Sequence, residues 1–514
     1  MSKLSSGVPS VPTARTAMRR GYMTQLVAIL SVLTLLVAAC GTGTQSSPGT
    51  GTPAVPGSPG TGTPAAPATP GTESPDTASP GTESPGTASP GTASPGTESP
   101  GASPGALECP DTAQGQTLEM WSPLTGPDGD EMTALAQRFS TENEWGITVN
   151  HVPNPDYLVA LTTAAASPDQ LPEMTVVRVI NVGELAARNI LQPWGDEALE
   201  ILGDVEGQMP ENVWTRGEYN GQRYSVPLDL AALVMYYNKE MFAAAGVEEP
   251  GTEPWTREEF EAALTALQES GVQAISIGTL FNSATLFQSF IVQFGGSVVN
   301  EDGTQATFNS PEGVEALTYI KQLRDTHGTQ ASGTGDPEVQ PFTQEQAAIV
   351  IHGPWHISNL AQLDYTGFAP IPQVGDEFAV WGGSHQLALH TDDPAIQAAA
   401  ACWMSWFLQN SLDWAAAGQI PAYTPARESP ELATRAPGIA AIAPSAEGVI
   451  ILPQVPGLEG AVWPQGFEPG IDAILLGEET DIQAVLDRQA QAAQQVIDQN
   501  AQQFGAGGSP APSP

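Results

Sequence analysis

Short apolar runs alternate with stretches of helical periodicity over residues 108–504. The pattern predicts strands over residues 117–121, 147–149 and 174–180, with helices over residues 130–139 and 182–189. Regular alternation of strands and helices is typical of α/β proteins with mainly parallel sheets. We therefore expect an α/β fold for this part of the chain.

Three further helices are indicated by the residues at their starts. Thr256 and Glu259 have the spacing of a capping box, in which each side chain binds the other's backbone N–H. Residues 310–311 and 393–394 place a Ser or Asp cap before a proline at the first helical position. The helix that follows at 395–408 is apolar nearly all round, so we expect it to be deeply buried.

The first 39 residues have the composition of an export signal. A basic stretch without acids precedes an apolar run that is short for a transmembrane helix. The run ends in Val37-Ala38-Ala39-Cys40-Gly41, which resembles the bacterial lipobox, so we expect Cys40 to be lipidated after cleavage. An uncleaved anchor helix is the alternative, and either outcome leaves the rest of the chain outside the cytoplasm. Adjacent arginines at 19–20 leave the Sec and twin-arginine export routes open.

Residues 40–107 predict a disordered tether. Residues 41–107 contain 14 Pro and 14 Gly and no aromatic residue, and a five-residue SPGT(A/E) motif recurs from residue 74. Such a segment buries too little apolar surface to offset its chain entropy. We expect it to hold the folded part away from a membrane, and we expect the tail at 505–514 to be disordered too.

Charge and cysteine content exclude several classes of protein. The 514 residues contain 57 acids against 16 Lys and Arg, a formal charge of −41, so the chain should repel nucleic acid. Three cysteines cannot form a disulfide framework, and there is no Cys-x-x-Cys pair. Cys402 could be a packed thiol or could pair with Cys109, and the sequence leaves both open.

Ordered sequence blocks over residues 117–500 resemble the family 1 extracellular solute-binding proteins of ABC transporters, the group that includes maltose-binding protein. Glu173 follows Pro172 where this family usually has Asp. The blocks that carry the resemblance are residues 118–129, 191–194, 226–229, 235–242, 255–260, 347–355, 381–385 and 418–423.

The resemblance implies a periplasmic-binding-protein fold of type II-like topology: two α/β lobes joined by hinge crossovers, with a ligand cleft between them. Lobe one would comprise residues 108–226 and 390–415, and lobe two residues 232–386 and 420–504. It also implies a monomeric carrier that captures a sugar-like solute and delivers it to the permease of an ABC transporter. We expect no enzyme activity, cofactor or metal.

A sugar site needs flat aromatic faces for the ring and charged or polar groups for the hydroxyls. The matched blocks offer, as ligand-binding candidates, Trp355 and Trp381 for stacking, then Trp121 and Tyr157, with Asp128, Arg178, Asp229, Gly382 and Ser384 as hydrogen-bonding groups.

Several candidates have structural alternatives. Trp121 could cap the core, Asp128 could form an Asx turn in its Gly/Pro loop, and Asp229 could brace a crossover. Arg178 interrupts an apolar strand, so it either pairs with a buried acid or reaches the cleft.

The sequence gives weaker support to other functions. The chain has no Gly-x-Ser-x-Gly or His-Glu-x-x-His motif of a hydrolase, although counting carboxylates cannot test for a glycoside hydrolase pair. His352 and His356 are four residues apart and could chelate zinc, but we expect structural histidines. A carrier of a non-sugar solute, such as a polyol phosphate or a metal, remains the alternative.

Overall fold

The computed structural model describes residues 108–331 and 335–504. The predicted signal peptide, Cys40, the tether and the C-terminal tail lie outside the described residues. Within these two ranges, no helix is long and apolar enough to cross a membrane.

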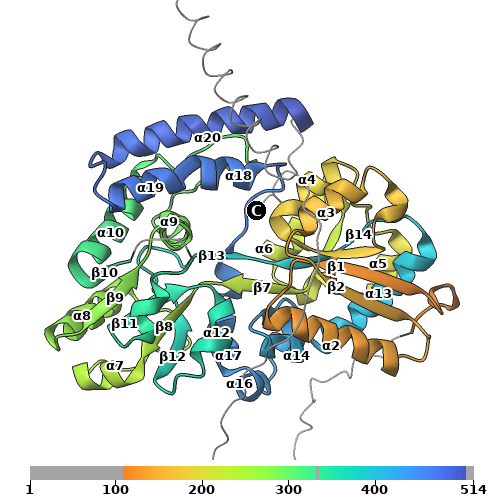
Figure 1. Ribbon diagram of the computed structural model, residues 1–514, viewed down its shortest axis with the longest axis horizontal. Helices are drawn as coiled ribbons and strands as arrows, with labels where there is room; N and C mark the ends of the chain where they lie inside the picture. The colour runs from red at the N-terminus through yellow and green to blue at the C-terminus, as the bar shows by residue number, and fades with distance from the viewer. Residues whose placement is uncertain (1–107, 332–334, 505–514) are drawn as a thin grey trace, which may run out of the picture. The chain divides into compact units, whose positions relative to one another are not determined.

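The first sheet has the strand order β2-β1-β3-β14-β6. Its strands are β1 (Thr117–Ser122), β2 (Thr148–Pro153), β3 (Met174–Arg178), β6 (Ser225–Pro227) and β14 (His385–Leu389). The helices that accompany it are α2 (Pro127–Glu142), α3 (Tyr157–Ala164), α4 (Val182–Ala187), α5 (Asp196–Leu202) and α13 (Pro394–Gln409) (Figure 1).

The second sheet has the order β10-β9-β11-β8-β12. Its strands are β8 (Val234–Asn238), β9 (Gln273–Ile277), β10 (Gly328–Gln330), β11 (Ala347–His352) and β12 (Thr366–Pro370). The helices grouped with it are α7 (Lys239–Ala245), α8 (Arg257–Glu269), α9 (Phe281–Gln293), α10 (Pro311–His327), α11 (Val339–Thr343), α12 (Ile357–Leu360), α18 (Leu458–Val462), α19 (Glu468–Leu475) and α20 (Ile482–Phe504).

A small third sheet, β15-β7-β13-β16, lies between the two large ones (Figure 1). Its strands are β7 (Asp229–Ala232), β13 (Val380–Gly383), β15 (Ile420–Pro421) and β16 (Val449–Ile450). β7 connects β6 of the first sheet to β8 of the second, and β13 leads back into β14 of the first sheet. The chain therefore crosses between two α/β lobes, as expected, while the detailed lobe limits given above stay a prediction.

The expectation of mainly parallel strands is only half right. β1 pairs in parallel with β2 and β3, but β14 is antiparallel to both β3 and β6. The second sheet repeats this division, because β8 is antiparallel to β11 and β12. The antiparallel strands are those that the chain enters from a crossover, so they approach each sheet from the opposite end.

The local helix signals are confirmed. Thr256 and Glu259 form both bonds of a capping box at the start of α8. The Ser310 side chain accepts from Gly313 N at the start of α10, and Asp393 accepts from Ala395 N at the start of α13. These caps satisfy N–H groups that have no partner within the helix.

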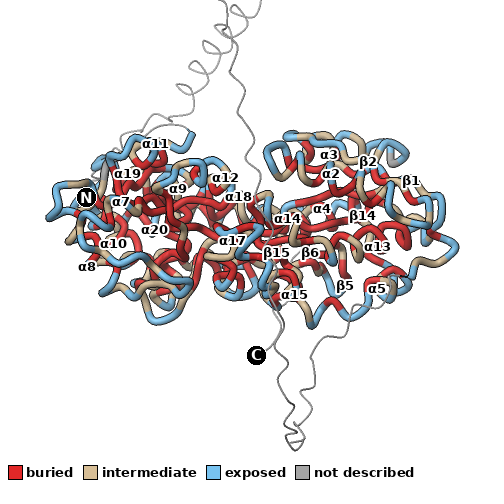
Figure 2. Tube along the Cα trace, turned by 90° about the horizontal axis from the view of Figure 1, so that it is seen from below, coloured by how far each residue is buried: buried red, intermediate tan, exposed pale blue. Residues whose placement is uncertain are grey.

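Helix α13 is buried as its apolar sequence predicts, with Trp403 and Phe407 inaccessible to solvent. Buried residues occupy the interior around both large sheets (Figure 2). Cys402 of α13 forms a disulfide with Cys109, 293 residues earlier, which settles the pairing that the sequence left open. The bond ties the N-terminal end of the described chain to a core helix.

Candidate functional site

A cavity of about 590 Å³ opens where the small third sheet meets the two large ones. This volume is within the usual range for small-molecule sites. The cavity is lined by Asp128, Arg178, Val179, Ile180, Ala231, Phe281, Gln288, Trp355, Trp381, Gly382, Gly383, Ser384, His385, Gln419, Ile450, Ile451, Leu452, Glu459, Trp463, Pro464 and Glu468.

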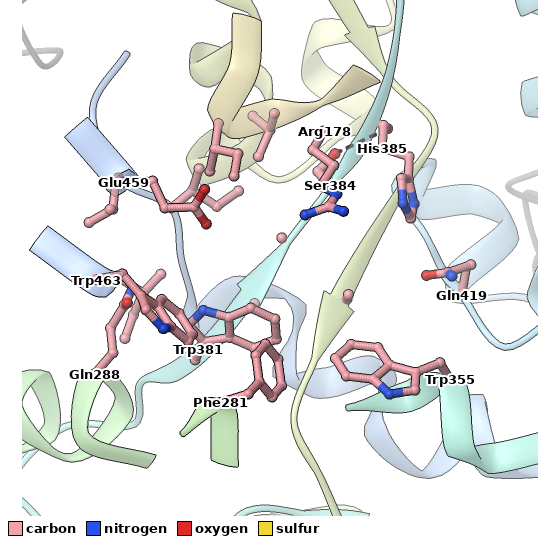
Figure 3. A pocket seen from close by; sticks show the side chains of 18 of the residues that line it. Arg178, Phe281, Gln288, Trp355, Trp381, Ser384, His385, Gln419, Glu459 and Trp463 are labelled. Atoms are coloured by element: carbon pink, nitrogen blue, oxygen red, sulfur yellow. Dashed lines mark hydrogen bonds between the residues drawn. The ribbon is translucent and has the colours of Figure 1, made fainter. Parts of the chain in front are cut away.

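Four aromatic rings form one wall of this cavity (Figure 3). Phe281 contacts Trp355, Trp381 and Trp463, with ring centroids 5.5, 5.1 and 5.6 Å away. Trp381 lies at 90° to Trp355 and at 72° to Trp463. We call these four residues the aromatic wall, and Trp355 is its most exposed member at 42%.

Close backbone packing positions the outer end of the aromatic wall. A Cβ on Gly353 would lie 2.1–2.3 Å from ring atoms of Trp355, so glycine lets this ring lie against the chain that follows β11. Leu280, directly before Phe281 of the aromatic wall, has a φ of 56°. This is the left-handed region, which residues with a β-carbon rarely adopt. Unusual backbone conformations of this kind are concentrated at ligand sites.

Charged groups face the aromatic wall from the other side of the cavity (Figure 3). Arg178 is at the end of β3 and is exposed, and it has no ion pair within the described residues. Burial raises the pKa of the Glu459 carboxyl, while the nearby Arg178 charge lowers it. The cavity therefore offers both a cation and a carboxyl group to a polar ligand.

Tyr157 supports Arg178 from behind. Its hydroxyl donates to Asn181 Oδ1 at 2.7 Å and accepts the Arg178 backbone N–H at 3.3 Å. Burial raises the pKa of Tyr157 to about 12, so the hydroxyl stays protonated. Tyr157 is 2% exposed and does not line the cavity.

His385 lines the cavity and is bound by Asp229, the first residue of β7. Its Nδ1 lies 3.0 Å from Asp229 Oδ2, and its backbone N–H donates to Asp229 Oδ1 at 2.7 Å. Trp414 Nε1 donates to the same carboxylate at 3.0 Å. Burial lowers the pKa of His385, but the Asp229 and Asp128 charges outweigh it and raise the pKa overall.

Six of the nine predicted ligand-binding residues line the cavity: Asp128, Arg178, Trp355, Trp381, Gly382 and Ser384. Asp128 Oδ1 also accepts from Gly126 N and Gly129 N, so its role in the loop coexists with its place in the lining. A Cβ on Gly382 would lie 2.0 Å from Ala231 O, which explains how β13 and β7 approach so closely.

The other three predicted residues lie outside the cavity lining. Trp121 packs against a hydrophobic cluster of the first lobe and donates to Glu119 Oε1 at 2.7 Å. Asp229 is fully buried, and both of its oxygens are taken by His385 and Trp414. Asp229 and Tyr157 each hydrogen-bond to a residue that lines the cavity, His385 and Arg178 respectively.

Sequence reasoning did not select Phe281, His385, Glu459 or Trp463. His385 was within a matched block, next to Ser384, and its chemistry could have been noticed there. Phe281, Glu459 and Trp463 belong to α9, α18 and the turn after α18, where no sequence feature pointed to a cleft.

Comparisons with known proteins agree with this architecture. Maltodextrin-binding protein MdxE of Bacillus subtilis (strain 168) is 25% identical over 313 residues, which is 57% of this chain and 71% of the relative. The sn-glycerol-3-phosphate-binding periplasmic protein UgpB of Escherichia coli (strain K12) is 22% identical over 320 residues, covering 58% of this chain and 72% of the relative.

Among solved structures, the sugar-binding protein MalE of the phytopathogen Xanthomonas citri has a TM-score of 0.65 at 20% identity. The match covers 76% of this chain and 99% of that one, and it shows the same two-lobe fold. Residues 124–411, more than half of the chain, match the family model of the bacterial extracellular solute-binding proteins. This chain belongs to that family of extracellular solute-binding proteins.

Proposed function

We propose that the protein captures a sugar or sugar-like solute in the cavity and delivers it to the permease subunits of an ABC transporter. The observation that carries the proposal is the aromatic wall opposite Arg178 and Glu459. Pyranose rings present apolar C–H faces to aromatic rings and present hydroxyls at their edges to charged groups. The similarity to MdxE and MalE supports the same ligand class.

Trp355 and Trp381 are the stacking surfaces in this proposal. Arg178 and Asp128 bind hydroxyls from the side of the first sheet, and Ser384 and Gly382 contribute from the crossover. Because these groups come from both lobes and from the strands between them, a bound ligand would favour the arrangement that brings all of them together. A permease that recognises this arrangement would bind the ligand-bound protein in preference to the empty one.

The family and the N-terminal sequence both support a site of action outside the cytoplasm. An extracellular family implies export of this chain. We propose that Cys40 is lipidated, that the Pro- and Gly-rich segment tethers the monomeric binding unit to the outer face of the membrane, and that the protein acts as a carrier without enzymatic activity. Two acyl chains give the stable attachment that a single chain cannot.

A polyol phosphate is the second candidate ligand, because Arg178 is a cation without an ion pair within the described residues. UgpB, with 22% identity, is named for binding sn-glycerol-3-phosphate. Glu459, Glu468 and Asp128 line the same cavity, however, and would repel a dianionic phosphate. A neutral ligand fits this mixture of charges better.

A thermal-shift screen of the purified protein tests the proposal. The panel comprises mono-, di- and oligosaccharides, polyols, sn-glycerol 3-phosphate, amino acids and short peptides. A ligand at 100-fold its Kd should stabilise the folded state by about 2.7 kcal/mol. Stabilisation by one class of neutral carbohydrate is the expected result. Stabilisation by the phosphate ester alone would favour the second candidate, and a response only to amino acids or peptides would contradict both.

A further inference from the structure

We propose that Asp336, Glu338, His352 and His356 form a binding site for one divalent transition-metal ion, with Zn²⁺ as the preferred ion. This site lies outside the cavity lining and would be additional to the solute site. The sequence favoured structural histidines here, because His352 falls in an apolar run and the chain has only six histidines. The structure adds two carboxylates to them.

Separate chain segments bring the four side chains together. His352 is the last residue of β11, and His356 is one turn later, in the short helix Pro354–His356. Asp336 and Glu338 come from the segment that leads into α11. One ligand atom from each of Asp336, His352 and His356 lies within 4.8 Å of the other two. Glu338 Oε1 is 3.0 Å from His352 Nε2.

The separations between ligand atoms suit a small ion. Zinc binds imidazole nitrogen and carboxylate oxygen at about 2.0–2.2 Å, so neighbouring ligand atoms of a tetrahedral site are about 3.3 Å apart. His352 Nε2 lies 3.4 Å from Asp336 Oδ1, and His356 Nε2 lies 3.0 Å from Asp336 Oδ2. The Glu338 contact is also close to that value. Because the two Asp336 separations involve different oxygens, this carboxylate would have to turn to present one oxygen to the ion.

One buried polar atom independently indicates a missing partner. The side chains of His352 and Glu338 are only 1% and 2% exposed. His352 Nε2 already faces the carboxylates of Glu338 and Asp336, whereas Glu338 Oε2 makes no hydrogen bond to any residue in 108–331 or 335–504. Buried polar groups nearly always have such partners, because leaving one without a partner is costly. A metal ion would bind the imidazole nitrogen and the carboxylate directly.

The donor set selects the class of ion. Two imidazole nitrogens with two carboxylates suit zinc and neighbouring transition metals, whereas Mg²⁺ and Ca²⁺ prefer oxygen ligands. Zinc on His352 Nε2 requires the ring proton on Nδ1, which lies 2.8 Å from the Gly353 N–H. The ring or this peptide must therefore turn slightly when the ion binds.

That movement would connect the metal site to the solute cavity. The His352 ring lies at 89° to Trp355, with centroids 5.4 Å apart, and its centroid is 5.8 Å from that of Phe281. Both are members of the aromatic wall, and Gly353 carries the chain directly into the Trp355 segment. This coupling rests on the proposed function, whereas the metal site itself does not.

Isothermal titration of the chelator-treated full chain with ZnCl₂, without solute, tests the site. We expect one zinc ion per chain, no comparable binding of Mg²⁺ or Ca²⁺, and tetrahedral absorption bands when Co²⁺ is used. His356→Ala removes a ligand nitrogen and Asp336→Asn replaces a charged ligand oxygen with a neutral amide, so each should weaken zinc binding at least tenfold. His327→Ala, which removes a histidine outside the cluster, should leave it unchanged.

Absence of stoichiometric zinc binding would overturn the proposal, and so would zinc binding that is equal in wild type, His356→Ala and Asp336→Asn. His356 and Asp336 are 17% and 39% exposed, so these variants should fold, and thermal unfolding in EDTA verifies this. Solute affinity measured with and without zinc then tests the coupling. An unchanged solute affinity would refute the coupling and leave the metal site standing.

Discussion

His385 Nδ1 lies 3.0 Å from Oδ2 of the fully buried Asp229, at the point where the two crossovers meet. Asp229 begins β7, which leads into the second lobe, and His385 begins β14, which returns to the first. The carboxylate holds the imidazole in place, and the imidazole in turn faces the cavity. A change in the charge of this pair therefore acts on the hinge and on the solute site together.

Asp229→Asn should destabilise the protein most at mildly acidic pH. The pKa of His385 is raised in the folded state, so its stabilising contribution is fully present below the ordinary histidine pKa and is lost as pH rises through the folded value. Removing one partner of a buried pair costs about 3 kcal/mol. Urea denaturation from about pH 6 to about pH 9 measures the unfolding free energy of wild type and variant. The difference between the two should become smaller as pH rises.

The control for this measurement is Asp364→Asn, which removes an exposed carboxylate. The unfolding free energy of this variant should follow that of wild type across the pH range. A gap between Asp229→Asn and wild type that stays constant with pH would show that the carboxylate acts only as a hydrogen-bond acceptor for Trp414 and the His385 backbone.

His390, five residues after His385, should make the pH dependence of stability run the other way, because its pKa is lowered rather than raised. Burial lowers its pKa to about 4. Its Nδ1 donates to Ile190 O at 2.8 Å, and its Nε2 accepts from Thr175 Oγ1, so the neutral ring is fully bonded. A histidine with a lowered folded pKa loses stability as pH falls from about 6.5 to about 4, by up to about 3 kcal/mol.

His390→Gln retains a donor and an acceptor but cannot gain a proton. Denaturation over the same acidic range should therefore show a shallower loss of stability than in wild type. Identical acid profiles would mean that His390 is not the group whose protonation destabilises the fold. His151, whose pKa burial also lowers to about 4, would then be the next histidine to replace.

The sequence predicted those parts of the structure that depend on neighbouring residues. Thr256 finds its partner three residues away, and the caps at Ser310 and Asp393 are equally local. The two-lobe fold came from the resemblance, which the family match confirms. The antiparallel strands β8 and β14 were missed, because their direction depends on where a crossover enters the sheet.

The cavity was predicted less completely, because its lining is assembled from distant segments. Phe281 meets Trp463, 182 positions later, and no local pattern encodes that contact. Asp229 was a reasonable candidate for ligand contact until the structure showed His385 and Trp414 using its oxygens. Long-range side-chain pairing is the information that a single sequence lacks.

Trp355→Ala should lose most of the solute affinity in the proposed function. Removing a central aromatic contact typically costs about 2 kcal/mol or more, which is roughly a thirtyfold increase in Kd. Trp145→Ala removes a tryptophan that does not line the cavity and should bind as wild type does. Titration calorimetry with the carbohydrate found in the screen measures both, and an unchanged Kd for Trp355→Ala would refute its stacking role.

Gly353→Ala offers a second test of the same ring without deleting it. The new Cβ would lie 2.1–2.3 Å from Trp355 ring atoms, so the ring must move. We expect weaker solute binding with little loss of stability, because the displaced atoms are the far end of a side chain that is 42% exposed. If the Kd stays unchanged although the intrinsic tryptophan fluorescence of Gly353→Ala differs from that of wild type, the position of this ring does not matter for binding.

Loss of the Cys109–Cys402 disulfide should destabilise the folded part of the chain without altering the cavity. The bond closes a loop of 293 residues, and loops of this size restrict the unfolded chain strongly. Cys402 is fully buried in α13, whereas Cys109 lies at the start of the described residues, away from the aromatic wall. The double variant Cys109→Ala/Cys402→Ala should therefore lose about 2–5 kcal/mol of unfolding free energy.

The Kd of this double variant for the solute should equal that of wild type, measured well below the midpoint of unfolding. Wild type should fall to the stability of the variant in a reductant that opens the bond, while the variant should not respond. Equal stability of wild type and variant under oxidising conditions would show that the packing of α13, rather than the disulfide, holds this end of the chain.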